Sequence, residues 1–284
     1  MNFGGLDAED RRLEDAQFVV IPVPYDLTST YQAGSRNGPA AILAASANME
    51  LYDEELGVET YLDGIHTTVP LEIDARGPEF MVRAVRDTVT QVISSHRIPV
   101  VLGGEHSVSI GAVQAVKDRY PSVSVLQLDA HADLRDSYQG SAYSHASVGR
   151  RISEMCPLVQ VGVRSMSADE ARFIENEKIP QYSPHQVKNY PDLIKKICGN
   201  LSEDIYVTLD LDVLDPSVMP ATGTPEPGGI LWDDLIRLIR GVSEQCTIRG
   251  FDIVELCPIP GMVAPDFTAA KLAYRIMGYI SGRG

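Results

Sequence analysis

The chain has 284 residues, of which 44% are hydrophobic, and it carries a formal net charge of −15 at pH 7. A nucleic-acid binder usually presents a basic surface, so we expect no nucleic-acid partner. No apolar run approaches the ~18 residues that cross a bilayer, and residues 1–17 are acidic and lack the apolar core of an export signal. We therefore expect a cytoplasmic protein with no membrane partner.

The organisation of the chain is expected to be simple. No linker rich in Pro, Gly or Ser and no long run of charge divides it, so residues 1–284 are predicted to form one domain. The four cysteines have no CxxC spacing, which predicts free thiols in a reducing compartment.

Short β-branched runs alternate along the chain with longer segments whose apolar spacing fits one face of a helix. The expected strands cover residues 18–24, 63–69, 98–104, 122–129, 158–163, 179–183, 205–212 and 248–256. The clearest helices cover residues 80–96, 109–120, 234–244 and 265–280. This alternation is typical of βαβ units and predicts an α/β protein with a parallel sheet.

Polar side chains gather where the predicted strands end, which is where parallel sheets bind ligands. Six of them are metal-ligand types: His106, Asp129, His131, Asp133, Asp210 and Asp212. Side chains of residues two apart on a strand point the same way. We therefore expect the side chains of Asp129 and His131 to converge on one position, and those of Asp210 and Asp212 to do the same. Four carboxylates this close would repel one another, and two divalent cations that share carboxylates would use all six groups.

The plainer interpretation is that each motif alone is structural. Acids after a strand often cap the next helix, and a histidine in a tight turn often bonds only to the backbone. The joint occurrence of the motifs at neighbouring strand ends favours a metal centre. Oxygen ligands with some imidazole suit Mn²⁺, while Zn²⁺, Co²⁺ and Fe²⁺ stay open. Because paired cations lower the pKa of a water toward ~7, the expected reaction is a hydrolysis.

These motifs resemble those of the ureohydrolases, the arginase and agmatinase family. The segments LGGEHS, LDAHADLRD, VTLDLDVLDP, GTPEPGG and FDIVEL occur in the order found in that family. Residues 25–46, YDLTSTYQAGSRNGPAAILAAS, are similar to the family's N-terminal segment. The resemblance implies a three-layer α/β/α fold with a central eight-stranded parallel sheet, two Mn²⁺ per chain, and a homo-oligomer, either a trimer or a hexamer. It also implies hydrolysis of a small cationic guanidino substrate to urea and an amine.

The resemblance further implies a role for each matching residue. The two metals would share Asp129 and Asp210; His106 and Asp133 would complete one site, and His131 and Asp212 the other. Three residues would be catalytic: Glu255 would receive the substrate guanidinium, His145 in YSHASVGRR would shuttle protons, and Asp133 would hold and pass a proton. His66, His96 and His185 match no family motif, and we expect them to be structural or solvated.

The segment LRDSYQGSAYSHASVGRR, which follows the D-x-H-x-D motif, resembles the agmatinase branch. Agmatine, which gives putrescine in polyamine biosynthesis, is therefore the expected substrate. N1-aminopropylagmatine, which gives spermidine, is a close alternative, followed by arginine, guanidinobutyrate and formimidoylglutamate. Two other classes stay open: a non-catalytic homologue and a single-metal deacetylase of acetylpolyamines.

Three positions depart from the family pattern. Glu105 stands where an Asp is frequent, Ala221 where a Gly is common, and Cys257 follows Glu255 by two residues where Asn-Pro is usual. We expect Glu105 to lie behind the metal ligands without functional consequence, and Cys257 to lie beside the guanidinium site.

Overall fold

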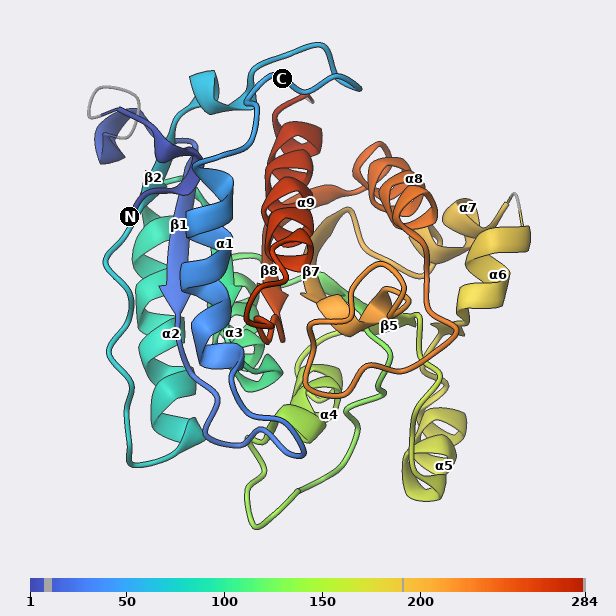
Figure 1. Ribbon diagram of the computed structural model, residues 1–284. Helices are drawn as coiled ribbons and strands as arrows, with labels where there is room; N and C mark the ends of the chain where they lie inside the picture. The colour runs from blue at the N-terminus through green and yellow to red at the C-terminus, as the bar shows by residue number, and fades with distance from the viewer. Residues whose placement is uncertain (8–11, 191, 283–284) are drawn as a thin grey trace.

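The computed structural model describes residues 1–7, 12–190 and 192–282, so residues 8–11 of the acidic N-terminal segment lie outside the described residues. Its centre is an eight-stranded parallel sheet with the order β2-β1-β3-β8-β7-β4-β5-β6 (Figure 1). The strands are β1 (Phe18–Val23), β2 (Ile65–Thr67), β3 (Ile98–Gly103), β4 (Ser124–Leu128), β5 (Leu158–Val161), β6 (Gln181–Tyr182), β7 (Asp204–Asp210) and β8 (Thr247–Val254). All eight expected strands are present, and the expected parallel sheet is confirmed.

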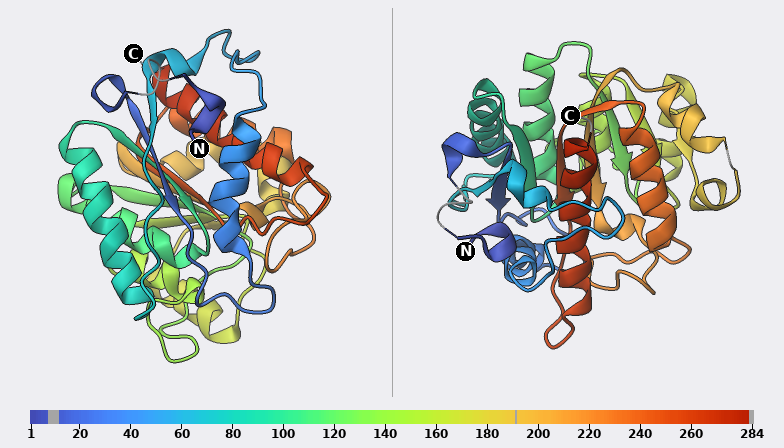
Figure 2. Two further views of the ribbon diagram at one scale, coloured as in Figure 1. Left: turned by 60° about the vertical axis from the view of Figure 1, so that its left-hand side comes forward. Right: turned by 90° about the horizontal axis from the view of Figure 1, so that it is seen from above.

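Helices cover both faces of this sheet (Figure 2). One layer contains α1 (Gly38–Ser46), α6 (Pro184–Asn189), α7 (Leu193–Cys198), α8 (Trp232–Ser243) and α9 (Ala264–Ser281). The other contains α2 (Pro78–Ser94), α3 (Ser109–Arg119), α4 (Val148–Ser153) and α5 (Ala168–Glu177). The four helices expected from the sequence are α2, α3, α8 and α9, and the three-layer α/β/α architecture is confirmed. Within the described ranges, none of the helices combines the length and apolar character that a bilayer crossing needs.

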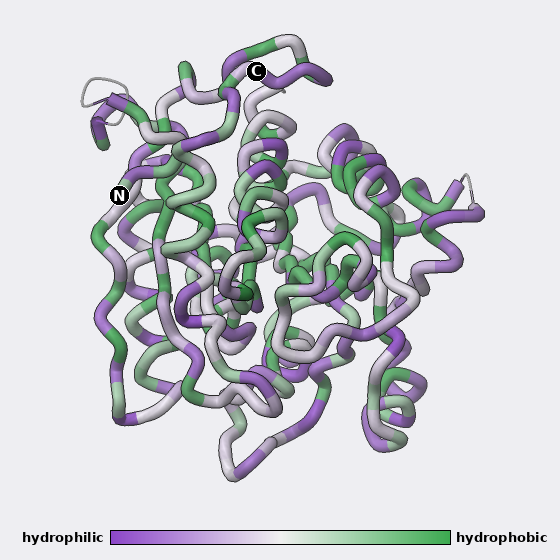
Figure 3. The backbone as a smooth tube through the Cα atoms, in the orientation of Figure 1, coloured by the Kyte–Doolittle hydropathy of each residue, from purple (hydrophilic) through white to green (hydrophobic). Residues whose placement is uncertain are grey.

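β1 is apolar throughout because both of its faces are covered. In β1, Phe18 and Val20 join the core beneath α1 and α9, whereas Val19 and Ile21 join the core beneath α2 and α3. A strand with water on one face would alternate apolar and polar residues, but one that is buried on both faces reads as a continuous apolar run. Figure 3 shows the consequence, with hydrophobic segments concentrated in the interior.

The chain leaves the sheet earlier than expected at two strand ends. β4 ends at Leu128 and β7 ends at Asp210, so the predicted alignment of Asp129 with His131, and of Asp210 with Asp212, along a strand is wrong. Instead each pair forms a turn: the His131 N–H donates to Asp129 Oδ1 (2.6 Å), and the Asp212 N–H donates to Asp210 Oδ1 (2.8 Å). An aspartate that accepts the N–H two residues ahead is a recurrent turn device, and it keeps both side chains at the strand end.

The segment after β1 lies against the end of β3. Glu105 N–H donates to Tyr25 O at 2.7 Å, and Gly104 N–H donates to Val23 O at 2.9 Å. A Cβ on Gly104 would lie 2.1 Å from the Tyr25 carbonyl oxygen, closer than two such atoms can approach. This glycine therefore allows the two loops to meet beside the candidate site.

We predict that Gly104→Ala lowers the free energy of unfolding by about 1–3 kcal/mol, because the added methyl group forces the two loops apart. Urea denaturation monitored by circular dichroism measures the effect. Gly282→Ala is the matched control, since its nearest neighbour, the Gly278 carbonyl oxygen, is 3.4 Å from the added Cβ. Equal stability of the two variants would contradict the close approach at Gly104.

Candidate metal centre and pocket

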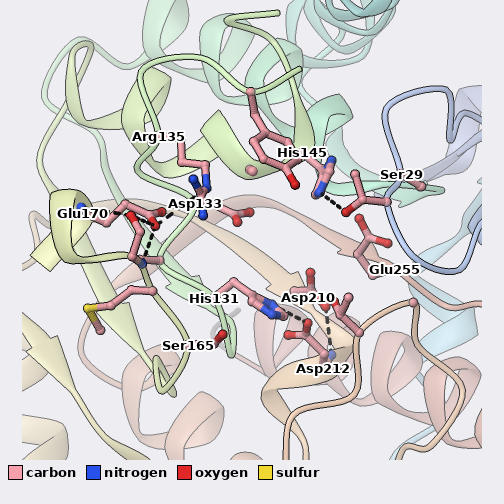
Figure 4. Close-up of a pocket in the computed structure, with 18 of the residues that line it drawn as sticks. Ser29, His131, Asp133, Arg135, His145, Ser165, Glu170, Asp210, Asp212 and Glu255 are labelled. Atoms are coloured by element: carbon pink, nitrogen blue, oxygen red, sulfur yellow. Dashed lines mark hydrogen bonds and ion pairs between the residues drawn. The ribbon is translucent and has the colours of Figure 1, made fainter. Parts of the chain in front are cut away.

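Four neighbouring strands bring the predicted site residues together. β3, β8, β7 and β4 are adjacent in the sheet, and the segments after them carry His106, Glu255, the Asp210/Asp212 pair and residues 129–133. His145 comes from the long segment between β4 and β5. Figure 4 shows six of these side chains around one pocket, whose volume is about 270 Å³: His131, Asp133, His145, Asp210, Asp212 and Glu255. A pocket of this volume suits a small polar molecule.

The first donor cluster centres on His106, which is buried. Its Nδ1 atom lies 3.1 Å from Asp129 Oδ2, 3.2 Å from Asp133 Oδ2 and 3.5 Å from Asp210 Oδ2. One ligand atom each from His106, Asp129 and Asp210 falls within a 4.8 Å group that could hold a metal ion. Three carboxylates therefore converge on one imidazole nitrogen that is itself buried.

The hydrogen bonds behind His106 identify which nitrogen carries the proton. Thr208 donates its hydroxyl proton to Asp252 Oδ1 (2.7 Å), so at its contact with His106 Nε2 (2.8 Å) the threonine oxygen must accept. Nε2 therefore carries the proton of the neutral ring. Nδ1 is buried without a hydrogen-bond partner and faces the three carboxylates. Burial lowers the pKa of His106, but the three carboxylates outweigh it and raise this pKa well above its ordinary value, so without a cation Nδ1 binds a second proton. A cation between them fits this arrangement, because the imidazole and the carboxylates are then all ligands.

A second donor cluster lies beside the first. His131 Nδ1 is 2.8 Å from Asp212 Oδ2 and 3.7 Å from Asp129 Oδ1, and Asp129, His131 and Asp212 form the second group that could hold a metal ion. The Ala130 N–H donates to Asp212 Oδ1 (3.0 Å), and Gln127 Nε2 donates to Asp129 Oδ2 (2.7 Å). Asp129 thus belongs to both clusters, as expected of a ligand that two cations share.

The pKa values of these groups reflect the crowded charges. Burial and the charge of Asp129 raise the pKa of Asp133 to about 7. Burial, with Asp212 and Asp129, raises the pKa of Asp210 well above its ordinary value. For His131, burial lowers the pKa, but Asp212 outweighs it and the result is about 11. Protons would therefore hold the cluster together without cations, and cations would displace them.

Glu255 and His145 face the same pocket. The His106 N–H donates to Glu255 Oε1 (2.7 Å), and burial with the charge of Glu105 raises the pKa of Glu255 to about 8. Burial, with the charges of His106 and His131, lowers the pKa of His145 to about 4, so this ring is neutral at pH 7. Glu255 (φ 67°) and Asp133 (φ 52°) adopt positive φ, which a non-glycine residue avoids unless the surroundings hold it there.

The structure also places the three positions that depart from the family pattern. Glu105 is buried and accepts hydrogen bonds from Thr28 and Ser107. The carbonyl group of Ala221, a buried residue, accepts the Cys257 N–H at 2.8 Å. The Cys257 thiol lies beneath residues 32–34, 3.7 Å from Gln32 Nε2, so it supports the loop that covers the pocket. Cys156, Cys198 and Cys257 are free thiols, as predicted.

Two functional candidates were missed at the level of sequence. Thr208 and Asp252 lie inside β7 and β8, where we read only strand content, yet they orient His106. The available signal was Asp252 itself, an acidic residue between the apolar Phe251 and Ile253. His66, His96 and His185 lie in β2, in the turn before β3 and in α6, outside the set of residues that line the pocket.

An eight-stranded parallel sheet that presents two acidic donor clusters at the carboxyl ends of its strands is the arrangement of a metal-dependent α/β hydrolase. Comparison with known proteins gives the family: the Arginase family profile matches residues 16–278. The chain belongs to the Arginase family, which confirms the resemblance seen in its motifs.

Individual relatives agree with this assignment. The chain is 39% identical to N(1)-aminopropylagmatine ureohydrolase of Thermus thermophilus, covering 97% of this chain and 93% of the relative. It is 33% identical to agmatinase of Pyrococcus horikoshii, covering 94% of this chain and 93% of the relative. The crystal structure of agmatine ureohydrolase of Thermoplasma volcanium superposes with a TM-score of 0.86 at 33% identity, covering 94% of this chain and 91% of that one.

The two clusters predict that the chain binds two divalent ions, and that single substitutions remove them unequally. Asp129→Asn should weaken both sites, whereas His131→Ala should weaken one, because Asp129 belongs to both clusters and His131 to one. Metal content after gel filtration, measured by mass spectrometry, distinguishes these results. His185→Ala, in an exposed part of α6, should keep both ions; equal loss in Asp129→Asn and His131→Ala would contradict a shared ligand.

Metal binding at pH 7.5 should release protons. The pKa of His131 is about 11 without metal, so the ring must lose a proton before a nitrogen can coordinate a cation. Isothermal titration calorimetry in buffers of different ionisation enthalpy measures the number of protons released. A binding enthalpy that is the same in every buffer would show that no proton leaves and would contradict the protonated cluster.

Proposed function

We propose that the protein hydrolyses the guanidino group of agmatine to urea and putrescine, with two Mn²⁺ ions in the two donor clusters. The observation that carries the proposal is that the two clusters share Asp129 and that members of both, Asp210 and Asp212, line one pocket with Glu255. The names of the relatives support it, since they include agmatinase and N(1)-aminopropylagmatine ureohydrolase. We place the reaction in cytoplasmic polyamine biosynthesis, carried out by a homo-oligomer.

The two clusters contain five of the six proposed ligands, whereas the inclusion of Asp133 and the sharing of Asp210 are proposed on the family resemblance. His106 and Asp133 would hold one ion, His131 and Asp212 the other, and Asp129 and Asp210 would bind both. When bound, the pair supplies Lewis acidity that lowers the pKa of a water toward neutrality. Thr208 and Asp252 hold the His106 ring so that its bare Nδ1 faces the carboxylates. The oxygen-rich donor set favours Mn²⁺.

Glu255 is the residue that receives the substrate cation. Its Oε1 already accepts the His106 N–H, and the carboxylate lines the pocket beside Asp210 and Asp212. A guanidinium pairs with a carboxylate through two parallel hydrogen bonds, which would fix the plane of the substrate and point its central carbon at the donor clusters. The raised pKa of Glu255 is reversed by this pairing, because a neighbouring cation favours the ionised carboxylate.

His145 and Asp133 are suited to move protons. His145 is neutral at pH 7, since its pKa is lowered to about 4, and it stands in the pocket wall with Thr30 near its Nε2 atom. A neutral imidazole accepts a proton and returns it to the departing amine. Asp133, with its pKa near 7, is the carboxylate that can hold a proton at the base of the pocket.

A second substrate, N1-aminopropylagmatine, is favoured by a specific observation. Four relatives at 34–39% identity are named for that activity, and three relatives named agmatinase are 31–33% identical. Both substrates present the same guanidinium to Glu255 and differ only in the cationic tail. The carboxylate of Glu226, whose Oε1 is 3.8 Å from His131 Nε2, adds negative charge on this side of the site.

The proposed function is tested by measuring urea release from Mn²⁺-loaded protein offered agmatine, N1-aminopropylagmatine, arginine and guanidinobutyrate. We expect urea from the first two and little from the others. Asp129→Asn should abolish release, and Glu255→Gln should lower kcat/KM by roughly 10²-fold, because a charge-assisted pair is lost.

His185→Ala is the control for this assay and should retain full activity, since its exposed side chain lies beside Asn189 in α6 and outside the lining of the pocket. Two bound metals with no urea from any substrate would contradict the proposal and favour a non-catalytic homologue. Acetate release from acetylpolyamines with one bound Zn²⁺ would favour the deacetylase.

A further inference from the structure

The loop between β1 and α1 connects Glu105 to His145 through one side chain, Thr28. We propose that Glu105 and Thr28 together set the tautomer of His145, with the ring proton on Nδ1 and Nε2 left bare as the atom that accepts protons in the pocket. Thr28 and Glu105 are then positioning residues. The catalytic consequence rests on the proposed function, in which His145 moves protons. The assignment of the tautomer is independent of that function.

Glu105 is surrounded by donors. Its Oε1 accepts the hydroxyl protons of Thr28 (2.5 Å) and Ser107 (2.6 Å). Its Oε2 accepts the main-chain N–H of Thr28 (2.6 Å) and lies 3.5 Å from the Ser29 hydroxyl. A carboxylate offers about four lone-pair directions, and all four are used here by groups that donate. Glu105 is fully buried, so no water competes for these bonds.

The hydroxyl proton of Thr28 is committed to Glu105, and this determines what Thr28 can do for His145. A hydroxyl has one proton, so Thr28 Oγ1 can act only as an acceptor toward every other neighbour. It accepts the His145 main-chain N–H at 3.1 Å and lies 3.3 Å from the ring Nδ1. If Nδ1 were unprotonated, its lone pair would face a lone pair of Thr28 Oγ1 at this distance, and the two would repel each other. The contact is favourable only when Nδ1 carries the proton.

The remaining neighbours of the ring are compatible with this tautomer. The Ser144 hydroxyl is 3.3 Å from Nδ1, and its oxygen can accept from Nδ1–H because its own proton is free to turn away. On the other side, Thr30 Oγ1 is 3.4 Å from Nε2 and can donate to it. The Tyr138 ring stands edge-on to the imidazole, with centroids 5.8 Å apart and an interplanar angle of 87°. These contacts fix the plane of the ring, and the contact with Thr28 determines which ring nitrogen carries the proton.

The length of the glutamate side chain at position 105 allows it to contact Thr28. Glu105 immediately precedes His106 and extends to Thr28, which lies 77 residues earlier in the chain. An aspartate at position 105 is shorter by one methylene group and would withdraw its oxygens from the Thr28 hydroxyl and N–H. The sequence predicts no functional consequence of Glu105, whereas the proposal gives this residue a specific role.

The direct test is the ¹⁵N NMR spectrum of histidine-labelled protein loaded with diamagnetic Zn²⁺, in which bare and protonated ring nitrogens resonate far apart. The His145 signals are assigned by their loss in His145→Gln. We expect a protonated Nδ1 and a bare Nε2 in the natural protein and in Thr28→Ser. Thr28→Val keeps the shape but removes the hydroxyl, and it should convert His145 wholly or partly to the other tautomer. Ser144→Ala should leave the tautomer unchanged.

Kinetics supply the second readout. Thr28→Val should lower kcat for urea release by roughly 10–10²-fold with little change in KM, which is within the range of lost acid–base assistance, and Thr28→Ser should restore it. Glu105→Asp should shift the tautomer in the same direction as Thr28→Val, so the test survives if one variant fails to fold. A bare Nδ1 in the natural protein, or an unchanged tautomer in both Thr28→Val and Glu105→Asp, would overturn the proposal.

The two proposals fail separately. If the natural protein releases no urea but His145 shows the Nδ1–H tautomer that Thr28→Val removes, the proposed function is wrong and the positioning role stands. If urea is released and the tautomer does not respond to Thr28→Val or Glu105→Asp, the function stands and the positioning role is wrong.

Discussion

The structure depends on one electrostatic constraint, the crowding of Asp129, Asp133, Asp210 and Asp212 around two imidazoles at the end of a buried sheet. Burial and mutual repulsion raise the pKa values of Asp129, Asp133 and Asp210, so the cluster is not stable with every carboxylate ionised and no counter-charge. Protons or divalent cations must supply that charge. The contacts of Thr208 and Asp252 suit cations, because they place the proton of the neutral His106 ring on Nε2 and direct Nδ1 at the carboxylates.

The fold supplies the positions that this constraint requires. The sheet places β3, β8, β7 and β4 side by side, so four segments that lie up to about half the chain apart contribute to one site. Hydrogen bonds between neighbouring parallel strands hold these ends at fixed spacing, and helices on both faces keep the strands rigid. Rigid strand ends let a small shell of ligands be held in place while the loops above them determine the substrate.

Much of this arrangement could be predicted from the sequence, for physical reasons. Strands buried on both faces leave continuous β-branched runs, and ligand residues at strand ends stand out because charge is rare beside such runs. The turns at Asp129 and Asp210 could not be predicted, because whether a chain continues as a strand depends on its neighbours in the sheet. Two further features were not predicted for the same reason, namely the positive φ of Asp133 and Glu255 and the orienting role of Thr208. Both depend on contacts between segments that are distant in sequence. The assignment of each ligand to one metal or the other stays a prediction.

The central claim is that two cations share Asp129 and Asp210 at the ends of β4 and β7. A crystal structure of the Mn²⁺-loaded protein, with anomalous diffraction data collected at the manganese edge, measures this directly. The account predicts two anomalous peaks roughly 3.5–4 Å apart, one beside His106 Nδ1 and the other beside His131, with carboxylate oxygens of Asp129 and Asp210 between them. A single peak, or two peaks that share no carboxylate, would contradict it.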